Sequence, residues 1–151
     1  YGARANIMWC GTIAHNGTCG VGCEEDWASH FLEHEVSAIY NVTHGAGLSV
    51  IVPAWMTFMA GHNPKKIAQF ANRVFGIPES EDLEEMALAG VSRLKHFFRF
   101  IGLPVNFKEL GIEEPDIDRL ADSLHRNKGE FVGNYVKLTK QDSKEIYRLA
   151  L

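Results

Sequence analysis

Apolar residues recur at three- and four-residue steps along most of this chain, and this helical period constrains the fold more than any other feature. The longest example covers residues 80–101, where these steps connect Leu83, Met86, Ala87, Gly90, Val91, Leu94, Phe97, Phe98 and Ile101. Such spacing places these side chains on one face of a helix. Sustained two-residue alternation is absent, and FVGNYVKL around Tyr135 is too short and too broken by glycine to indicate a sheet. We therefore predict an all-α fold.

Polar residues mark where the predicted helices begin. Ser80 is the predicted N-cap of the helix that runs to residue 101, and Asp116 caps a shorter helix. Thr139, followed three residues later by Asp142, resembles a capping box before the final helix. The apolar run at residues 48–60 has 13 residues and a proline. A bilayer span needs about 20 residues, so we expect this run to form a buried helix.

Length and composition bound the kind of protein this chain can be. It has 151 residues, 46% of them hydrophobic, and no internal repeat, which predicts one domain with a sizeable core. The net charge of −4 gives no reason to expect a nucleic-acid or membrane partner. Three cysteines suit reduced thiols better than a secreted disulfide framework, so we expect a cytoplasmic location.

Three of the seven histidines lie close together in the sequence: His30, His34 and His44. His30 and His34 are four residues apart, so a helix projects both imidazoles from the same face. On an unbroken helix, His44 would lie about 21 Å along the axis from His30, too far for one ion. A shared site therefore requires a chain reversal, which residues 40–43 can provide. The spacing alone leaves open which two histidines would bind a metal.

Other metal motifs compete for the same residues. The string from His30 to His34 matches the H-x-x-E-H pattern of inverzincin metallopeptidases, in which Glu33 would be the general base of a zinc peptidase. Cys19 and Cys23 could join the two histidines in a zinc finger. The six-residue gap between the cysteine and histidine pairs is about half the usual linker, which argues against that alternative.

Four segments, in order along the chain, resemble one known family. They are RANIMWCGTIAHNG at residues 4–17, DWASH at 26–30, LEHEVSAIYNVTHGAGLSVIVPAWM at 32–56 and LTKQDSKEIYRLAL at 138–151. Together they resemble the iron-containing alcohol dehydrogenases, most closely the branch of butanol dehydrogenases and NADPH-dependent aldehyde reductases. The resemblance covers essentially all 151 residues. It implies the C-terminal helical domain of a longer enzyme that transfers hydride between NAD(P)H and an aldehyde or ketone.

The resemblance also implies roles for the three histidines. His30 and His44 would bind Fe2+ or Zn2+, and His34 would act in proton transfer beside the substrate. The other two metal ligands and the N-terminal dinucleotide-binding domain would lie before Tyr1. We therefore expect residues 1–151 to form a single helical domain that is inactive alone, because NAD(P)H binds mainly to the missing domain. We further expect a homodimer, since apolar surface left without that domain favours self-association; a non-catalytic self-association domain is the remaining alternative.

Glu33 departs from the family pattern, in which this position is glycine or another small residue. Its carboxylate could pair with His34, act as an outer partner of the metal site or face solvent, and we expect it to face solvent. Glycines at 45 and 47 let another group approach the backbone closely. The three tryptophans, at positions 9, 27 and 55, are expected in the core.

Overall fold

The computed structural model describes all 151 residues and confirms the all-α prediction. Its helices are α1 (Gly2–His15), η1 (Thr18–Gly20, a 3-10 turn), α2 (Ala28–Tyr40), α3 (His44–His62), α4 (Lys65–Phe75), α5 (Leu83–Phe100), α6 (Ile117–Lys128) and α7 (Lys140–Arg148). The only β pairing is an isolated bridge between Val132 and Leu138. None of the helices combines the length and apolarity that crossing a bilayer demands.

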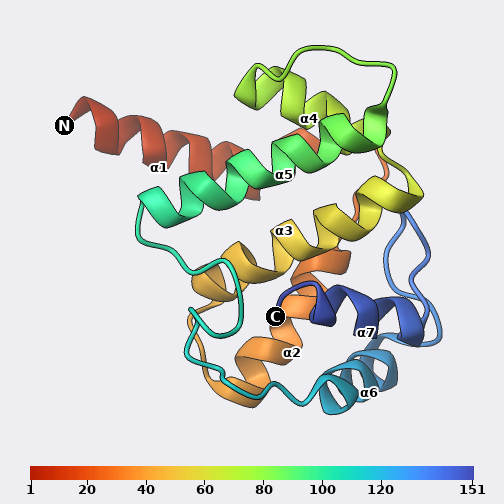
Figure 1. Ribbon diagram of the computed structural model, residues 1–151. Coiled ribbons are helices and arrows are strands. Elements are labelled where there is room, and N and C mark those ends of the chain that lie inside the picture. The colour runs from red at the N-terminus through yellow and green to blue at the C-terminus, as the bar shows by residue number, and fades with distance from the viewer.

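Helix α3 lies in the middle of the molecule and organises the core. It packs against α2, α5 and α7, while α4 covers α5 on one side and α6 pairs with α2 and α7 on the other (Figure 1). Ten of its 19 residues are buried, among them Val50, Ile51 and Met59, which are fully inaccessible. A helix that is apolar on most sides has to be enclosed by others. The predicted buried helix at residues 48–60 is thus confirmed.

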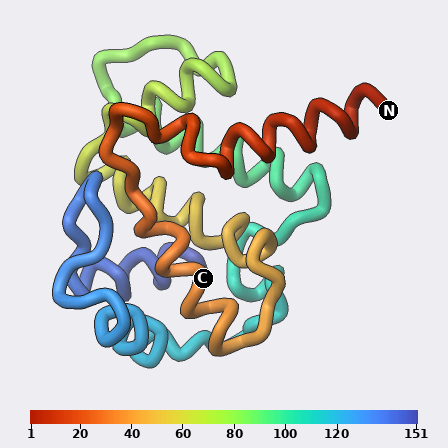
Figure 2. Tube along the Cα trace, turned by 180° about the vertical axis from the view of Figure 1, so that it is seen from behind, coloured from red at the N-terminus to blue at the C-terminus, as the bar shows by residue number.

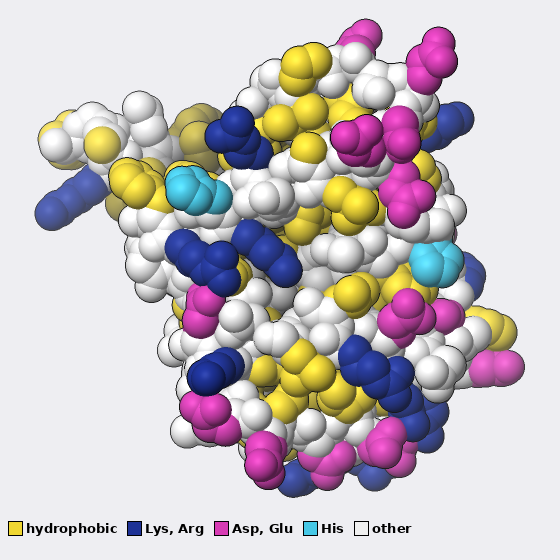
Figure 3. All heavy atoms as spheres, in the orientation of Figure 1, with side chains coloured by type: hydrophobic (Ala, Val, Ile, Leu, Met, Phe, Trp, Pro, Cys, Tyr) yellow, Lys and Arg dark blue, Asp and Glu magenta, His cyan; other side chains and the backbone are white.

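Helix α1 stands apart from this core. It packs mainly against η1, buries none of its residues and leads the N-terminus away from the body in both views (Figures 1 and 2). Figure 3 shows it as an arm beside the main mass. Trp9 lies on this arm with 65% of its surface exposed, and Trp27 is 45% exposed at the start of α2. The expectation that these two tryptophans lie in the core is therefore wrong; Trp55 is half-buried against the core.

The predicted helix starts are correct in two cases. Asp116 caps α6, and Thr139 forms a capping box with Asp142 at the start of α7. Ser80 is not the cap of α5. That helix begins later because the Asp82 carboxylate accepts a hydrogen bond of 2.9 Å from a first-turn backbone N–H.

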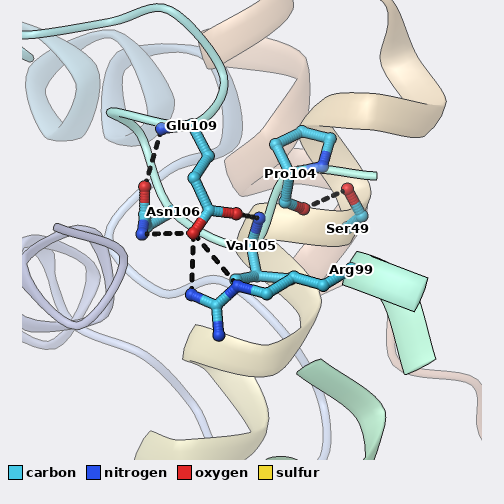
Figure 4. Close-up of polar contacts among 6 residues, drawn as sticks. All are labelled: Ser49, Arg99, Pro104, Val105, Asn106 and Glu109. Atoms are coloured by element: carbon cyan, nitrogen blue, oxygen red, sulfur yellow. Dashed lines mark hydrogen bonds and ion pairs between the residues drawn. The ribbon is translucent and has the colours of Figure 1, made fainter. Parts of the chain in front are cut away.

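The loop after α5 is held in place by the carboxylate of Glu109 (Figure 4). This carboxylate accepts hydrogen bonds of 2.7–3.1 Å from the Arg99 guanidinium, the Asn106 amide and the Val105 backbone N–H. The Arg99 hydrogen bond is the main reason that the pKa of Glu109 lies below its ordinary value. Next to this cluster, the Pro104 carbonyl oxygen accepts a hydrogen bond of 2.7 Å from Ser49 Oγ. The loop is thereby fixed against the first turns of α3.

Candidate metal centre

The chain reverses between α2 and α3, as the histidine spacing requires. Helix α2 ends at Tyr40, and Asn41 takes the left-handed conformation with φ of 53°. Thr43 is extended, and α3 starts at His44. The two helices then pack against each other (Figure 2). The prediction of a reversal at residues 40–43, instead of one straight helix, is confirmed.

This reversal brings the three predicted histidines together. The ring centroids of His30 and His44 are 5.6 Å apart, those of His34 and His44 5.2 Å, and those of His30 and His34 6.4 Å. Two imidazoles that share an ion, each with its nitrogen about 2.1 Å from the metal, have centroids about 5 Å apart. Both pairs that include His44 therefore have the spacing that a shared ion needs.

The closest group of potential ligand atoms does not consist of the three predicted histidines. One atom each from Glu33, His34 and His44 lie within 4.8 Å of one another, and His30 is not in that group. The geometry thus brings the rings of His30, His34 and His44 close together and does not distinguish ligands from neighbours. Neither Cys19 nor Cys23 belongs to a group of this kind, and both are free and exposed, so the zinc-finger alternative has no support.

Glu33 is fully buried, and the expectation that it faces solvent is wrong. One of its carboxylate oxygens contacts Nδ1 of His44, and the other contacts Oγ of Ser37. The carboxylate is accommodated because residue 47 is glycine: a methyl group there would overlap it. Of the two glycines expected to allow a close approach to the backbone, Gly47 does so, because the Glu33 carboxylate lies against it. A methyl group on Gly45 would meet open space. Because Glu33 has no exposure to solvent, its carboxylate is poorly placed to activate water, which argues against the peptidase alternative.

The surroundings of His30 favour a neutral ring. Its pKa is lowered, first by burial and then by the nearby imidazoles of His44 and His34. Glu33 opposes this shift, and His15, at the end of α1, adds to it. A neutral imidazole keeps the lone pair that a cation requires. His34 and His44 are exposed. A set of imidazoles backed by a carboxylate fits a divalent ion such as Zn2+ or Fe2+.

The helix that carries His30 and His34 is anchored at two points that the sequence analysis missed. Asp26 accepts a 2.6 Å hydrogen bond from the N–H of residue 28 at the start of α2, and its second oxygen accepts bonds of 3.0 and 2.7 Å from the N–H groups of residues 134 and 135. Farther along, the Tyr147 hydroxyl donates a 2.8 Å hydrogen bond to the carbonyl of Leu32. Burial raises the pKa of Tyr147. These bonds fix α2 relative to the C-terminal part of the chain.

Known proteins of one kind match the whole chain. The family model described as "Fe-containing alcohol dehydrogenase family, C-terminal" matches residues 1–151. The "Probable NADH-dependent butanol dehydrogenase 1" of Bacillus subtilis is 37% identical over 152 residues, which cover 100% of this chain and 39% of the relative. The "NADH-dependent butanol dehydrogenase A" of Clostridium acetobutylicum is 32% identical over 149 residues, which cover 98% and 38%.

Solved structures agree with these sequence relatives. The NADH-dependent butanol dehydrogenase A of Thermotoga maritima matches with a TM-score of 0.90 and 39% identity, covering 99% of this chain and 39% of its own. The substrate- and cofactor-free form of the aldehyde reductase YqhD from Escherichia coli matches with a TM-score of 0.92 and 32% identity, covering 100% and 40%. The chain therefore spans about two-fifths of the length of the relatives it matches.

Proposed function

Because this chain belongs to the iron-containing alcohol dehydrogenase family, we propose that it supplies the metal-binding helical part of an NAD(P)-dependent alcohol dehydrogenase or aldehyde reductase. The observation that carries this proposal is the convergence of His30, His34 and His44 across the turn between α2 and α3. The substrates we propose are short- or medium-chain alcohols and the corresponding aldehydes. The names of the relatives, butanol dehydrogenases and an aldehyde reductase, support this substrate class.

In this proposal His30 and His44 hold a divalent ion, Fe2+ or Zn2+, with one imidazole from each helix. The ion, when bound, acts as a Lewis acid toward the carbonyl oxygen of the substrate. Partial burial lowers the pKa of His30, which favours the neutral ring that a cation requires. His34 is exposed beside both rings, and we assign it the proton that the substrate oxygen gains or loses. Imidazole suits that role because it exchanges protons readily near neutral pH.

We further propose that dinucleotide binding and the remaining metal ligands belong to residues outside this chain. The relatives are about two and a half times as long as the matched region. The isolated chain should then bind metal weakly and transfer no hydride. Self-association as a homodimer and a cytoplasmic location also belong to this proposal; the exposed apolar residues of α1 support the first, and the three free cysteines the second.

A second assignment of the ligands is favoured by one observation. His34 and His44 lie in the closest group of potential ligand atoms, whereas His30 does not. Titrating the purified chain with Zn2+, while recording the imidazole 15N resonances by NMR, separates the two assignments. If His30 and His44 are the ligands, His30→Ala and His44→Ala weaken Zn2+ binding, and His34→Ala leaves it nearly unchanged. Loss of binding in His34→Ala, with His30→Ala unaffected, would reverse the roles of these two residues.

A further inference from the structure

We infer that Glu33 is a positioning residue of the metal centre, an outer carboxylate that fixes the tautomer and orientation of the His44 imidazole. The inference rests on the proposed function, because it concerns how a proposed metal ligand is held. Glu33 lies on α2 and His44 at the start of α3, so the contact also joins the two helices that form the site.

The environment of Glu33 shows that the fold gives this carboxylate a specific place. The side chain has 0% exposure, and burying a charged group is unfavourable unless it is paired and hydrogen-bonded. Both oxygens are satisfied: one contacts the ring of His44, and the other the hydroxyl of Ser37 one helical turn along α2. Gly47 leaves the space in which the carboxylate sits. Ser37 on α2 and His44 and Gly47 on α3 therefore all accommodate the Glu33 carboxylate.

The contact determines which nitrogen of His44 can bind a cation. In this inference the Glu33 carboxylate, which when ionised only accepts hydrogen bonds, accepts one from the Nδ1–H group of a neutral His44 ring. The other nitrogen, Nε2, then holds the free lone pair. A carboxylate bound to the far nitrogen of a metal-binding imidazole fixes the ring and raises its basicity. Without Glu33, His44 would populate both tautomers and more than one ring orientation.

Direct coordination by Glu33 is the competing explanation, since its carboxylate belongs to the closest group of potential ligand atoms. The observed contacts argue against it. The oxygen on the side of the histidines lies directly against Nδ1 of His44, and the second oxygen is taken by Ser37. A cation at either oxygen would compete with these hydrogen bonds. The carboxylate thus lies behind the ligand and not in its place.

The test measures Zn2+ affinity and the His44 tautomer together, by long-range 1H–15N NMR of the purified chain. Glu33→Ala should shift His44 from a pure Nδ1–H form to a mixture and weaken Zn2+ binding about 10–100-fold, the usual cost of losing an outer partner. Glu33→Gln should lose less than tenfold, because the amide oxygen can still accept from Nδ1 and the amide nitrogen can donate to Ser37. Gly47→Ala keeps the carboxylate but displaces it, and should also weaken binding.

Glu35→Gln is the matched control. Glu35 is a second buried glutamate on α2, 6% exposed, whose carboxylate accepts a 2.9 Å hydrogen bond from Asn127 on α6. This variant should bind Zn2+ and hold the His44 tautomer as the unmodified chain does. Circular dichroism establishes that each variant is folded, and Gly47→Ala replaces Glu33→Ala should the latter unfold.

The outcomes separate this inference from the proposed function. Unchanged affinity and tautomer in both Glu33→Ala and Gly47→Ala would overturn the positioning role while the metal site stands. Equal, large losses in Glu33→Ala and Glu33→Gln, without a change of tautomer, would overturn it in favour of direct coordination. Zn2+ binding that is insensitive to both His30→Ala and His44→Ala would reject the proposed metal site itself, and the positioning role with it.

Discussion

Helices α4 and α5 pack closely at Gly90, and replacing this residue with alanine tests how these helices pack. A methyl group on Gly90 would overlap the Cβ of Ala71 and lie 2.9 Å from its Cα. Ala71 is fully buried on the inner face of α4. Because its Cα belongs to the backbone, relief requires the two helices to separate instead of one side chain rotating.

Two opposing effects set the size of the change. Overpacking in a well-filled core costs about 1–3 kcal/mol. Replacing glycine with alanine within a helix stabilises the helix by about 1 kcal/mol. We expect Gly90→Ala to lower the free energy of unfolding by up to about 2 kcal/mol, which for a chain of this length lowers Tm by up to roughly 8 °C.

Gly61→Ala provides the matched control in another helix. A methyl group there meets nothing closer than a Glu84 carboxylate oxygen at 3.9 Å, so only the helix-propensity gain remains. Near the end of α3 this gain should be below about 1 kcal/mol, and Tm should rise slightly. Thermal and urea denaturation followed by circular dichroism compare the two variants. If Gly90→Ala were as stable as Gly61→Ala, the close packing of α4 on α5 would be refuted.

Three further predictions concern charge, anchoring and activity. The hydrogen bond from Arg99 lowers the pKa of Glu109, so the ionised carboxylate stabilises the folded state fully at pH values above the ordinary carboxyl pKa of about 4.5. This stabilisation is lost as the pH falls through the lower pKa that Glu109 has in the folded chain. Glu109→Gln should therefore lose less stability than the unmodified chain between pH 6 and pH 3, and equal losses in urea midpoints would contradict this. Tyr147→Phe removes the hydrogen bond to Leu32 and should cost about 1 kcal/mol in urea unfolding; a change below about 0.3 kcal/mol would deny this bond a role in holding α2. The purified chain should not oxidise NADPH in the presence of butyraldehyde, and measurable turnover would disprove the proposed dependence on residues outside it.

Local patterns predicted much of the helical architecture. The three- and four-residue apolar spacing of residues 80–101 becomes α5, with its start moved from Ser80 to Asp82. The Asp116 and Thr139 caps lie within a few residues of the N–H groups they satisfy, so no distant contact is needed to recognise them. The burial of tryptophans could not be predicted in this way. Trp9 is apolar but lies on a helix in which none of the residues is buried.

In the candidate site, too, local patterns predicted some features, and others depend on packing between distant segments. Helical spacing places His30, Glu33, His34 and Ser37 on one stripe of α2, at steps of three and four residues. A signal for the role of Glu33 was therefore present in the sequence, together with the glycine at position 47. Spacing does not say whether that stripe faces water or another helix. The expectation of solvent exposure for Glu33 was wrong for this reason.

By itself, the sequence determined which residues share a helix, where the helices break, and that His30 and His34 project together, because these properties depend on dihedral angles and neighbours within a few residues. Only the tertiary structure decided that α3 packs against α2, that the ring centroids of His30 and His44 are 5.6 Å apart, and that Glu33 is buried beside Gly47. Those contacts are set by close packing between distant segments, in which a single methyl group at position 47 would displace the carboxylate.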